Sequence, residues 1–213
     1  MKLNGYFFSY SIALFILFCI VIVDKVFNIP ADFFTRDIAA FAGVHPFAGS
    51  LSTLGILLWC ASASVCFFAS ALIRKKEQFR SSLFLFSSGL FTSYLALDDA
   101  FMFHESIAKT YFSVSESVVY SLIAIAFVFY IIFFRGIILR TRYETLLFSI
   151  FLLGLSVAMD FGLPAANLKE WKDLFEDGLK WLGIVSWCIY YTNTSFDICL
   201  KSRVCKSFLM YSN

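Results

Sequence analysis

The sequence predicts an all-α integral membrane protein, built as a bundle of six transmembrane helices with both termini in the cytoplasm. Three observations lead to this fold class. Hydrophobic residues make up 60% of the 213 residues and charged residues only 15%. In soluble domains, roughly a quarter of all residues are charged. Six apolar stretches approach the length of about 20 residues that a spanning helix needs. Basic residues gather in alternate connections, as expected of cytoplasmic loops.

The apolar stretches follow one another along the whole chain, so residues 1–213 are predicted to form a single multi-pass membrane domain. The first stretch has the length of a signal peptide, but no small-residue cleavage site follows it, which favours a retained helix. Serines, alanines and glycines in the second and third stretches are expected to let those two helices approach closely. The predicted helices cover approximately residues 6–23, 51–73, 82–103, 115–134, 145–163 and 174–196.

Residues 31–45, between the first two helices, are predicted to form an amphipathic helix in the outer membrane interface. Phe33, Phe34 and Phe41 recur at helical spacing with charged residues between them, which is typical of a helix that lies along a membrane surface. The helix is expected to end near Gly43.

The charge distribution predicts the orientation. The connections near residues 74–80 and 135–142, the C-terminal tail and Lys2 fall on one side, which holds eleven basic and three acidic residues. The other side holds six basic and twelve acidic residues. An excess of Lys and Arg marks the cytoplasmic face. We therefore expect the protein in the inner (plasma) membrane with both termini on the cytoplasmic side. Orientation accounts for the basic loops, so no nucleic-acid partner is implied, although the loops leave room for a cytoplasmic protein partner.

Polar residues gather at the predicted outer ends of the third, fifth and sixth helices. Ionisable groups at such places are costly in a membrane and therefore indicate function by default. If the third helix continues through the motif, Asp98 and Glu105 lie two turns apart on one face. Lys180 is expected to pair with Glu176 or with a carboxylate of another helix. The candidate site residues, facing the periplasm or exterior, are Asp98, Asp99, His104, Glu105, Asp160, Glu176 and Lys180.

Three interpretations of this cluster stay open. The first is a ligand-, cation- or proton-responsive site, because histidine changes its charge between about pH 5 and 8. The second is a divalent metal site (Zn, Mn or Fe) that activates water for hydrolysis of a lipid or amide bond. The third is a purely structural network in which Asp98, Asp160 and Lys180 lock three helices together. The metal ligands of the second interpretation are Asp98, His104, Asp160 and Glu176.

The segment Leu97-Asp98-Asp99…His104-Glu105 and the later Glu176…Lys180-x-x-Gly183 resemble a loose group of small bacterial multi-pass membrane proteins. This resemblance implies a topology and the location of a site. The chain also shows a partial likeness to CREST-type membrane hydrolases, the relatives of alkaline ceramidase. That family carries several histidines, including a pair on its last helix, and the present sequence has none there. The departure counts against hydrolysis.

We therefore expect a non-catalytic membrane subunit: a sensor, a scaffold or an ion- or proton-conducting component, without an assigned catalytic residue or cofactor. The alternative is a metal-dependent membrane hydrolase. The expected partners are the lipid bilayer and further copies of the chain in a homo-oligomer, because the chain is small and its helices are weakly polar. In size and shape the chain is similar to membrane subunits of bacterial stress and anti-phage defence systems.

Overall fold

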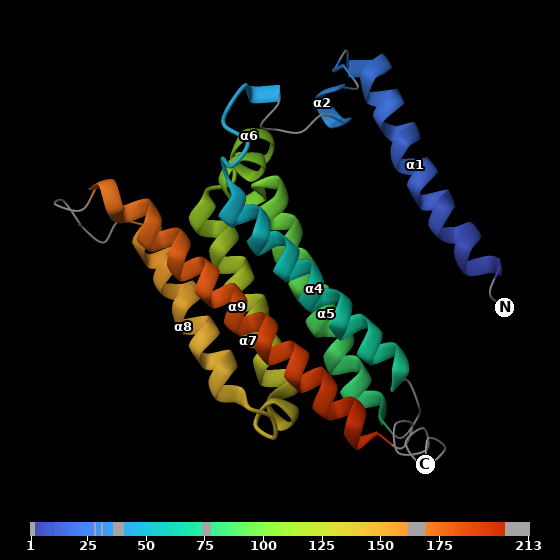
Figure 1. The fold of residues 1–213 in the computed structure, drawn as a ribbon, viewed down its shortest axis with the longest axis vertical. Coiled ribbons are helices and arrows are strands. Elements are labelled where there is room, and N and C mark those ends of the chain that lie inside the picture. Colours follow the sequence, from blue (N-terminus) through green and yellow to red (C-terminus); the bar gives the residue numbers. More distant parts are fainter. Residues whose placement is uncertain are drawn as a thin grey trace. The chain divides into compact units, whose positions relative to one another are not determined.

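The structure is a computed structural model of the full chain and describes residues 3–27, 29–30, 32–35, 41–73, 78–161 and 169–202. Every regular element in these ranges is helical, as the sequence predicts. The chain forms two compact units, Met1–Gly49 and Ser50–Asn213 (Figure 1).

The first unit contains the apolar helix α1 (Leu3–Phe27) and the short helix α2 (Asp32–Thr35). Helix α1 covers the predicted first span, residues 6–23, and extends it by about a turn at each end. From residue 13 to residue 23 it carries only hydrophobic residues, which is typical of a helix surrounded by lipid or protein.

The predicted amphipathic segment, residues 31–45, is partly described. The ring of Phe33 contacts those of Phe34 and Phe41 edge-on, with centroid separations of 5.7 and 5.1 Å. The chain turns at Gly43, whose φ of 65° needs a residue without a Cβ. The helical start and the turn near Gly43 agree with the prediction, residues 36–40 lie outside the described ranges, and the position in the membrane interface stays a prediction.

The second unit holds the five other long helices at the places where the sequence predicts them. Helix α9 extends beyond the predicted span 174–196 by five residues at each end. Its added ends contain Lys and Glu, good helix formers that a search for apolar stretches does not register. The elements are α4 (Ser50–Leu72), α5 (Phe79–Phe101), η2 (Phe103–Ile107), α6 (Ala108–Phe112), α7 (Glu116–Ile138), α8 (Tyr143–Asp160) and α9 (Lys169–Lys201).

The third predicted span ends earlier than expected. Helix α5 stops at Phe101, and Met102 takes a left-handed conformation with φ 49°, in which its N–H donates to the carbonyl of Asp98. One wide helical turn, η2, follows. The condition under which Asp98 and Glu105 would share one helical face, a third helix that continues through the motif, is therefore not met. A left-handed residue reverses the direction of the chain, and the residues beyond it return toward the end of α5.

Small residues bring α4 and α5 close together. Helix α4 packs against α5 and α9, and α9 also packs against α8 (Figure 1). The hydroxyls of Ser70 and Ser82 lie 3.0 Å apart across the α4–α5 contact, and each also donates to the carbonyl of the other residue. A Cβ atom at Gly89 would lie 2.8 Å from the ring of Phe67. The predicted close approach of these two helices is confirmed.

Helices α8 and α9 approach each other in the same way. The hydroxyl of Ser149 donates to the carbonyl of Gly183 at 2.8 Å. A Cβ atom at Gly183 would lie 2.8 Å from the side chain of Leu153 and 3.2 Å from its backbone nitrogen. Gly183 is therefore the residue that allows α9 to lie directly on α8.

Aromatic side chains attach α7 to the other helices. Tyr130 of α7 lies between α5 and α9, with its hydroxyl 2.7 Å from Ser88 Oγ and 3.1 Å from the hydroxyl of Tyr191. Its ring stacks near Phe84, which is fully buried. These hydroxyl groups satisfy one another, so the core can hold them without unpaired polar atoms.

Among the described residues, α4, α7 and α8 are long and apolar enough to cross a membrane. Large apolar side chains on these helices point away from the bundle; Phe68, Phe129 and Phe151 are each more than 60% exposed. Apolar surface of this extent requires a lipid or protein environment, which indicates a membrane protein. Spans at α1, α5 and α9, and the side on which the termini lie, stay predictions.

The glycine packing is testable on α9 itself. We expect Gly183→Ala to lower the free energy of unfolding by about 1–3 kcal/mol, because the added methyl group must displace Leu153 and its backbone. The matched control is Gly178→Ala, where a Cβ meets no atom within 4 Å and alanine raises helix propensity. Unfolding of the detergent-solubilised protein by SDS, followed by circular dichroism, measures both. Equal stabilities of the two variants would contradict the close packing.

Candidate functional site

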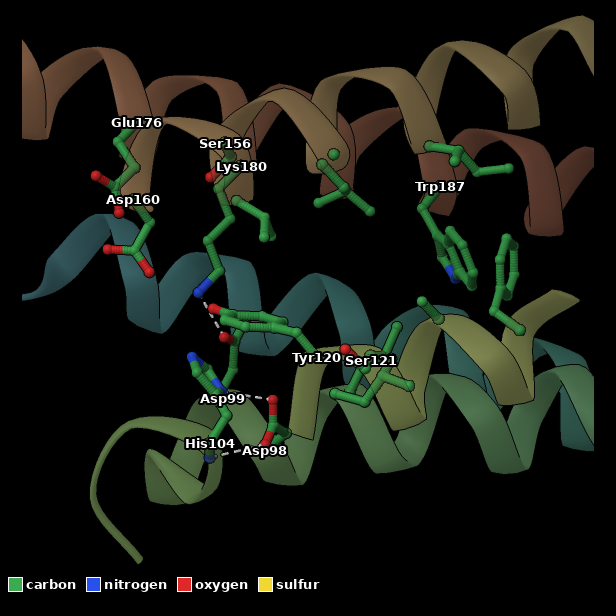
Figure 2. Close-up of a pocket in the computed structure, with 18 of the residues that line it drawn as sticks. Asp98, Asp99, His104, Tyr120, Ser121, Ser156, Asp160, Glu176, Lys180 and Trp187 are labelled. Atoms are coloured by element: carbon green, nitrogen blue, oxygen red, sulfur yellow. Dashed lines mark hydrogen bonds and ion pairs between the residues drawn. The ribbon is translucent and has the colours of Figure 1, made fainter. Parts of the chain in front are cut away.

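The second unit contains a cavity of about 610 Å³, lined by residues of α4, α5, η2, α7, α8 and α9. The polar residues gather at one end, and Trp187 lies toward the other end (Figure 2). Small-molecule sites typically occupy 300–1,000 Å³ and combine an apolar lining with a few convergent polar groups. The cavity has both properties, which makes it the candidate functional site.

A buried pair, Asp98 and His104, forms the first part of the polar end. The turn at Met102 brings His104 back onto the end of α5. The His104 ring nitrogen Nδ1 lies 2.7 Å from Asp98 Oδ2, and the backbone N–H of His104 donates to Asp98 Oδ1 at 3.2 Å. The two residues are 6% and 4% exposed. The carboxylate thereby fixes the orientation of the imidazole, and the charge on His104 decides whether this contact is an ion pair or a neutral hydrogen bond.

A second carboxylate, Asp99, joins three helices. Lys180 of α9 donates to Asp99 Oδ1 of α5 at 2.5 Å, and Trp59 Nε1 of α4 donates to Asp99 Oδ2 at 3.0 Å. Figure 2 shows Lys180 reaching across the cavity from α9 toward α5. Both oxygens of Asp99 are thus occupied, and its side chain is 10% exposed. Two pairings were predicted for Lys180, one with Glu176 and one with a carboxylate of another helix. The contact with Asp99 is a pairing of the second kind.

The opening of the cavity carries further acidic groups, and we call Asp160, Glu176 and Asp177 the acidic rim. All three line the cavity. Asp160 and Asp177 are exposed and Glu176 is half-buried. Asp160 and Glu176 lie side by side, on the far side of Lys180 from Trp187 (Figure 2). The side chains therefore become more buried from the rim through the Asp98 and Asp99 pairs toward Trp187.

The structure brings most of the predicted site residues into one place. Six of the seven line this cavity, and the side chain of the seventh, Glu105, lies outside the described part of the structure. The function of these residues stays a prediction. The six residues are Asp98, Asp99, His104, Asp160, Glu176 and Lys180.

Two aromatic residues of the site were not predicted from the sequence. Trp59 lies within an apolar stretch but donates to Asp99, and the ring of Tyr120 lies 4.8 Å from the ring of His104. A buried Trp or Tyr generally needs a partner for its N–H or O–H group. A tryptophan or tyrosine in the outer half of a predicted span could therefore have indicated these two residues from the sequence.

Aromatic side chains close the far end of the cavity. Trp187 is 2% exposed, donates to Thr92 Oγ1 at 3.1 Å, and lies 5.7 Å from Phe127 and 6.2 Å from Phe91 between ring centroids. We call Phe91, Phe127 and Trp187 the aromatic floor. Because the indole N–H is already bonded, the floor offers a ligand mainly apolar surface.

The predicted metal ligands do not form a recognisable metal centre. In the described ranges, no group of three His, Cys, Asp or Glu side chains is arranged to hold a metal ion. Asp98 and His104 contact each other, whereas Asp160 and Glu176 belong to the rim (Figure 2). The metal site stays a prediction, without support from this geometry.

The pair of Lys180 and Asp99 can be tested with a double-mutant cycle. We expect Lys180→Met to lower the free energy of unfolding by about 1–3 kcal/mol, because Asp99 is left charged and poorly compensated. The double variant Lys180→Met, Asp99→Asn should regain part of this loss, since asparagine can still accept from Trp59. SDS unfolding of both single variants and the double variant measures the coupling. Additive losses, or an equal loss in the exposed-rim control Asp177→Asn, would contradict the pairing.

The comparisons with known proteins yield one match. No curated protein and no solved structure matches the chain. The model of one family, described as a domain of unknown function (DUF8692), matches residues 13–194. This match includes α4 to α8 and every described residue of the cavity. The chain therefore belongs to the DUF8692 family.

Proposed function

We propose that the protein is a non-catalytic, six-span subunit of the inner membrane, with both termini in the cytoplasm, that responds to a ligand or a proton at its outward-facing cavity. The observation that carries this proposal is the polar network of Asp98, His104, Asp99 and Lys180 at one end of the cavity. Three apolar helices and the excess of Lys and Arg in alternate connections support the membrane topology.

The network links ligand binding to helix position. Asp99 holds α5 to α9 through Lys180 and to α4 through Trp59. A ligand that competes for these groups alters the interactions between the helices, whereas a proton on His104 changes the charge of its contact with Asp98, the residue next to Asp99. A ligand can shift a conformational equilibrium only through a difference in its affinity for the two states. Contacts that join separate helices provide such a difference when the helices move.

The pH response can be tested through the two histidines of the chain. We expect the wild-type protein to show a change in tryptophan fluorescence between about pH 5 and 8, where histidine titrates, because Trp59 bonds to Asp99 next to the Asp98–His104 pair. His104→Gln should abolish the change. The matched control is His45→Gln in the first unit, which should retain it. A change that survives in His104→Gln, or disappears in His45→Gln, would contradict the proposal.

The contact of Asp98 with His104 keeps the hydrolase as the second candidate. A carboxylate that orients an imidazole in a cavity is also found at metal ligands and general bases. Elemental analysis of the purified wild type beside an Asp98→Ala, His104→Ala variant separates the two functions. For the non-catalytic subunit we expect no stoichiometric metal in well-folded wild type. About one equivalent of Zn, Mn or Fe that is lost in the variant would favour the hydrolase.

Association with other chains belongs to the same proposal. A homo-oligomer would cover part of the apolar surface of α4, α7 and α8, and the basic connections would face the cytoplasm, where a protein partner could bind them. A role as a sensor, scaffold or conducting component in a bacterial stress or anti-phage defence system fits a subunit of this kind.

A further inference from the structure

The cavity changes in polarity along its length, and this gradient carries an inference about its ligand. At the opening, Asp160 and Asp177 of the acidic rim are exposed. In the middle, the side chains of Asp98, His104 and Asp99 are at most 10% exposed, and that of Lys180 is 36% exposed. At the far end, Trp187 of the aromatic floor is 2% exposed. A molecule that fills the cavity therefore meets water and carboxylates at one end and apolar rings at the other.

The charge of the lining selects the polar end of the ligand. Among the described lining residues there are five carboxylates and one lysine. That lysine, Lys180, is already bonded to Asp99, and Asp98 is bonded to His104. The lining residues that the structure describes therefore carry more acidic than basic side chains, and Asp160 and Asp177 lie exposed at the opening. A positively charged group is attracted there, and a carboxylate or phosphate is repelled.

The floor and side walls select the rest of the ligand. Beside Phe91, Phe127 and Trp187, the aliphatic side chains of Ile150 and Leu153 face the cavity. Filling this part with an apolar group removes apolar surface from water and stabilises the complex. A small inorganic cation would leave it empty.

We infer that the cavity binds an amphipathic organic amine, with its protonated amino group at the acidic rim and its apolar body against the aromatic floor. This inference rests on the proposed ligand-responsive function and names the chemical class of the ligand. The amine lies near Asp160 and Asp177, the exposed carboxylates at the opening of the cavity. The apolar body passes the Asp99–Lys180 pair, so that binding directly affects the contacts between α5 and α9.

One glycine of the lining offers a position from which a larger side chain can fill the cavity, and a second glycine elsewhere serves as its control. Gly154 of α8 lines the cavity, and a Cβ atom added there meets no atom within 4 Å. Gly154→Leu therefore places a side chain in the cavity without an initial clash. Gly136 of α7 has equally open surroundings but is not among the lining residues, which makes Gly136→Leu the matched control. Both changes remove a glycine from a helix, so their effects on helix propensity are similar.

The experiment measures retention of radiolabelled dodecylamine on the full-length protein in alkyl maltoside micelles. We expect saturable binding of about one equivalent to the wild type and to Gly136→Leu, and roughly tenfold or more weaker binding to Gly154→Leu. Dodecanoic acid, which has the same chain length and the opposite charge, should bind roughly tenfold or more weakly than dodecylamine. Methylamine, which has the charge without the chain, should also bind more weakly by this factor.

Each opposite result overturns the inference. Equal binding of dodecylamine by the two glycine variants would place the amine outside the cavity. Equal binding of dodecanoic acid would remove the role of the rim, and equal binding of methylamine would remove that of the floor. The pH response of His104 separates this inference from the proposed function: a response without amine binding refutes only the ligand class, and amine binding without a response refutes only the pH switch.

Discussion

Charged groups within a membrane bundle must be paired, and the contact between Asp99 and Lys180 is the pair on which the arrangement of the second unit depends. A lone charge in such a place is costly, so both residues gain by approaching each other. Their approach links α9 to α5 through side chains, and the hydrogen bond from Trp59 joins α4, against which both helices pack, to the same carboxylate. The close contacts of serine and glycine then determine how near the helix backbones lie. Together, these interactions leave a cavity that is lined by the paired charges and by residues of α7 and α8.

The left-handed residue Met102 has a comparable effect over a shorter distance. Without it, α5 would continue and carry His104 away from the cavity along the helix. The reversal at Met102 instead places the His104 ring and backbone N–H on the two oxygens of Asp98. A non-glycine residue with positive φ is costly, and such strain is commonly found where function or tight packing compensates for it. The Asp98–His104 contacts are compensation of this kind, because they satisfy two polar groups that are both buried.

The sequence predicted the helices well because hydrophobic length is a strong signal. The positions of the six long helices and the convergence of Asp98, Asp160 and Lys180 on one cavity followed from apolar stretches and from the high cost of charge in a membrane. The break at Met102 was not predictable, since methionine has no preference for positive φ. The partner of Lys180 also required the structure, because a helical neighbour such as Glu176 is the nearest choice in sequence, whereas the partner used comes from a helix 81 residues away. Trp59 was missed because tryptophan in an apolar stretch is ordinarily read as lipid-facing or core.

The two carboxylates at the middle of the cavity, Asp98 and Asp99, have different hydrogen-bond partners. This difference explains how one site can be both stable and responsive. Asp99 accepts a hydrogen bond at each oxygen from a different helix, so its role is to hold the bundle together. Asp98 bonds instead to a residue only six positions away, and a change in that contact does not separate any helices by itself. The Asp98–His104 pair can therefore change its charge while the Asp99 contacts keep the cavity intact. A ligand that passes the Asp99–Lys180 pair acts on contacts between helices directly, whereas a proton on His104 acts first on the imidazole and its carboxylate, and the two signals therefore enter the site through different residues.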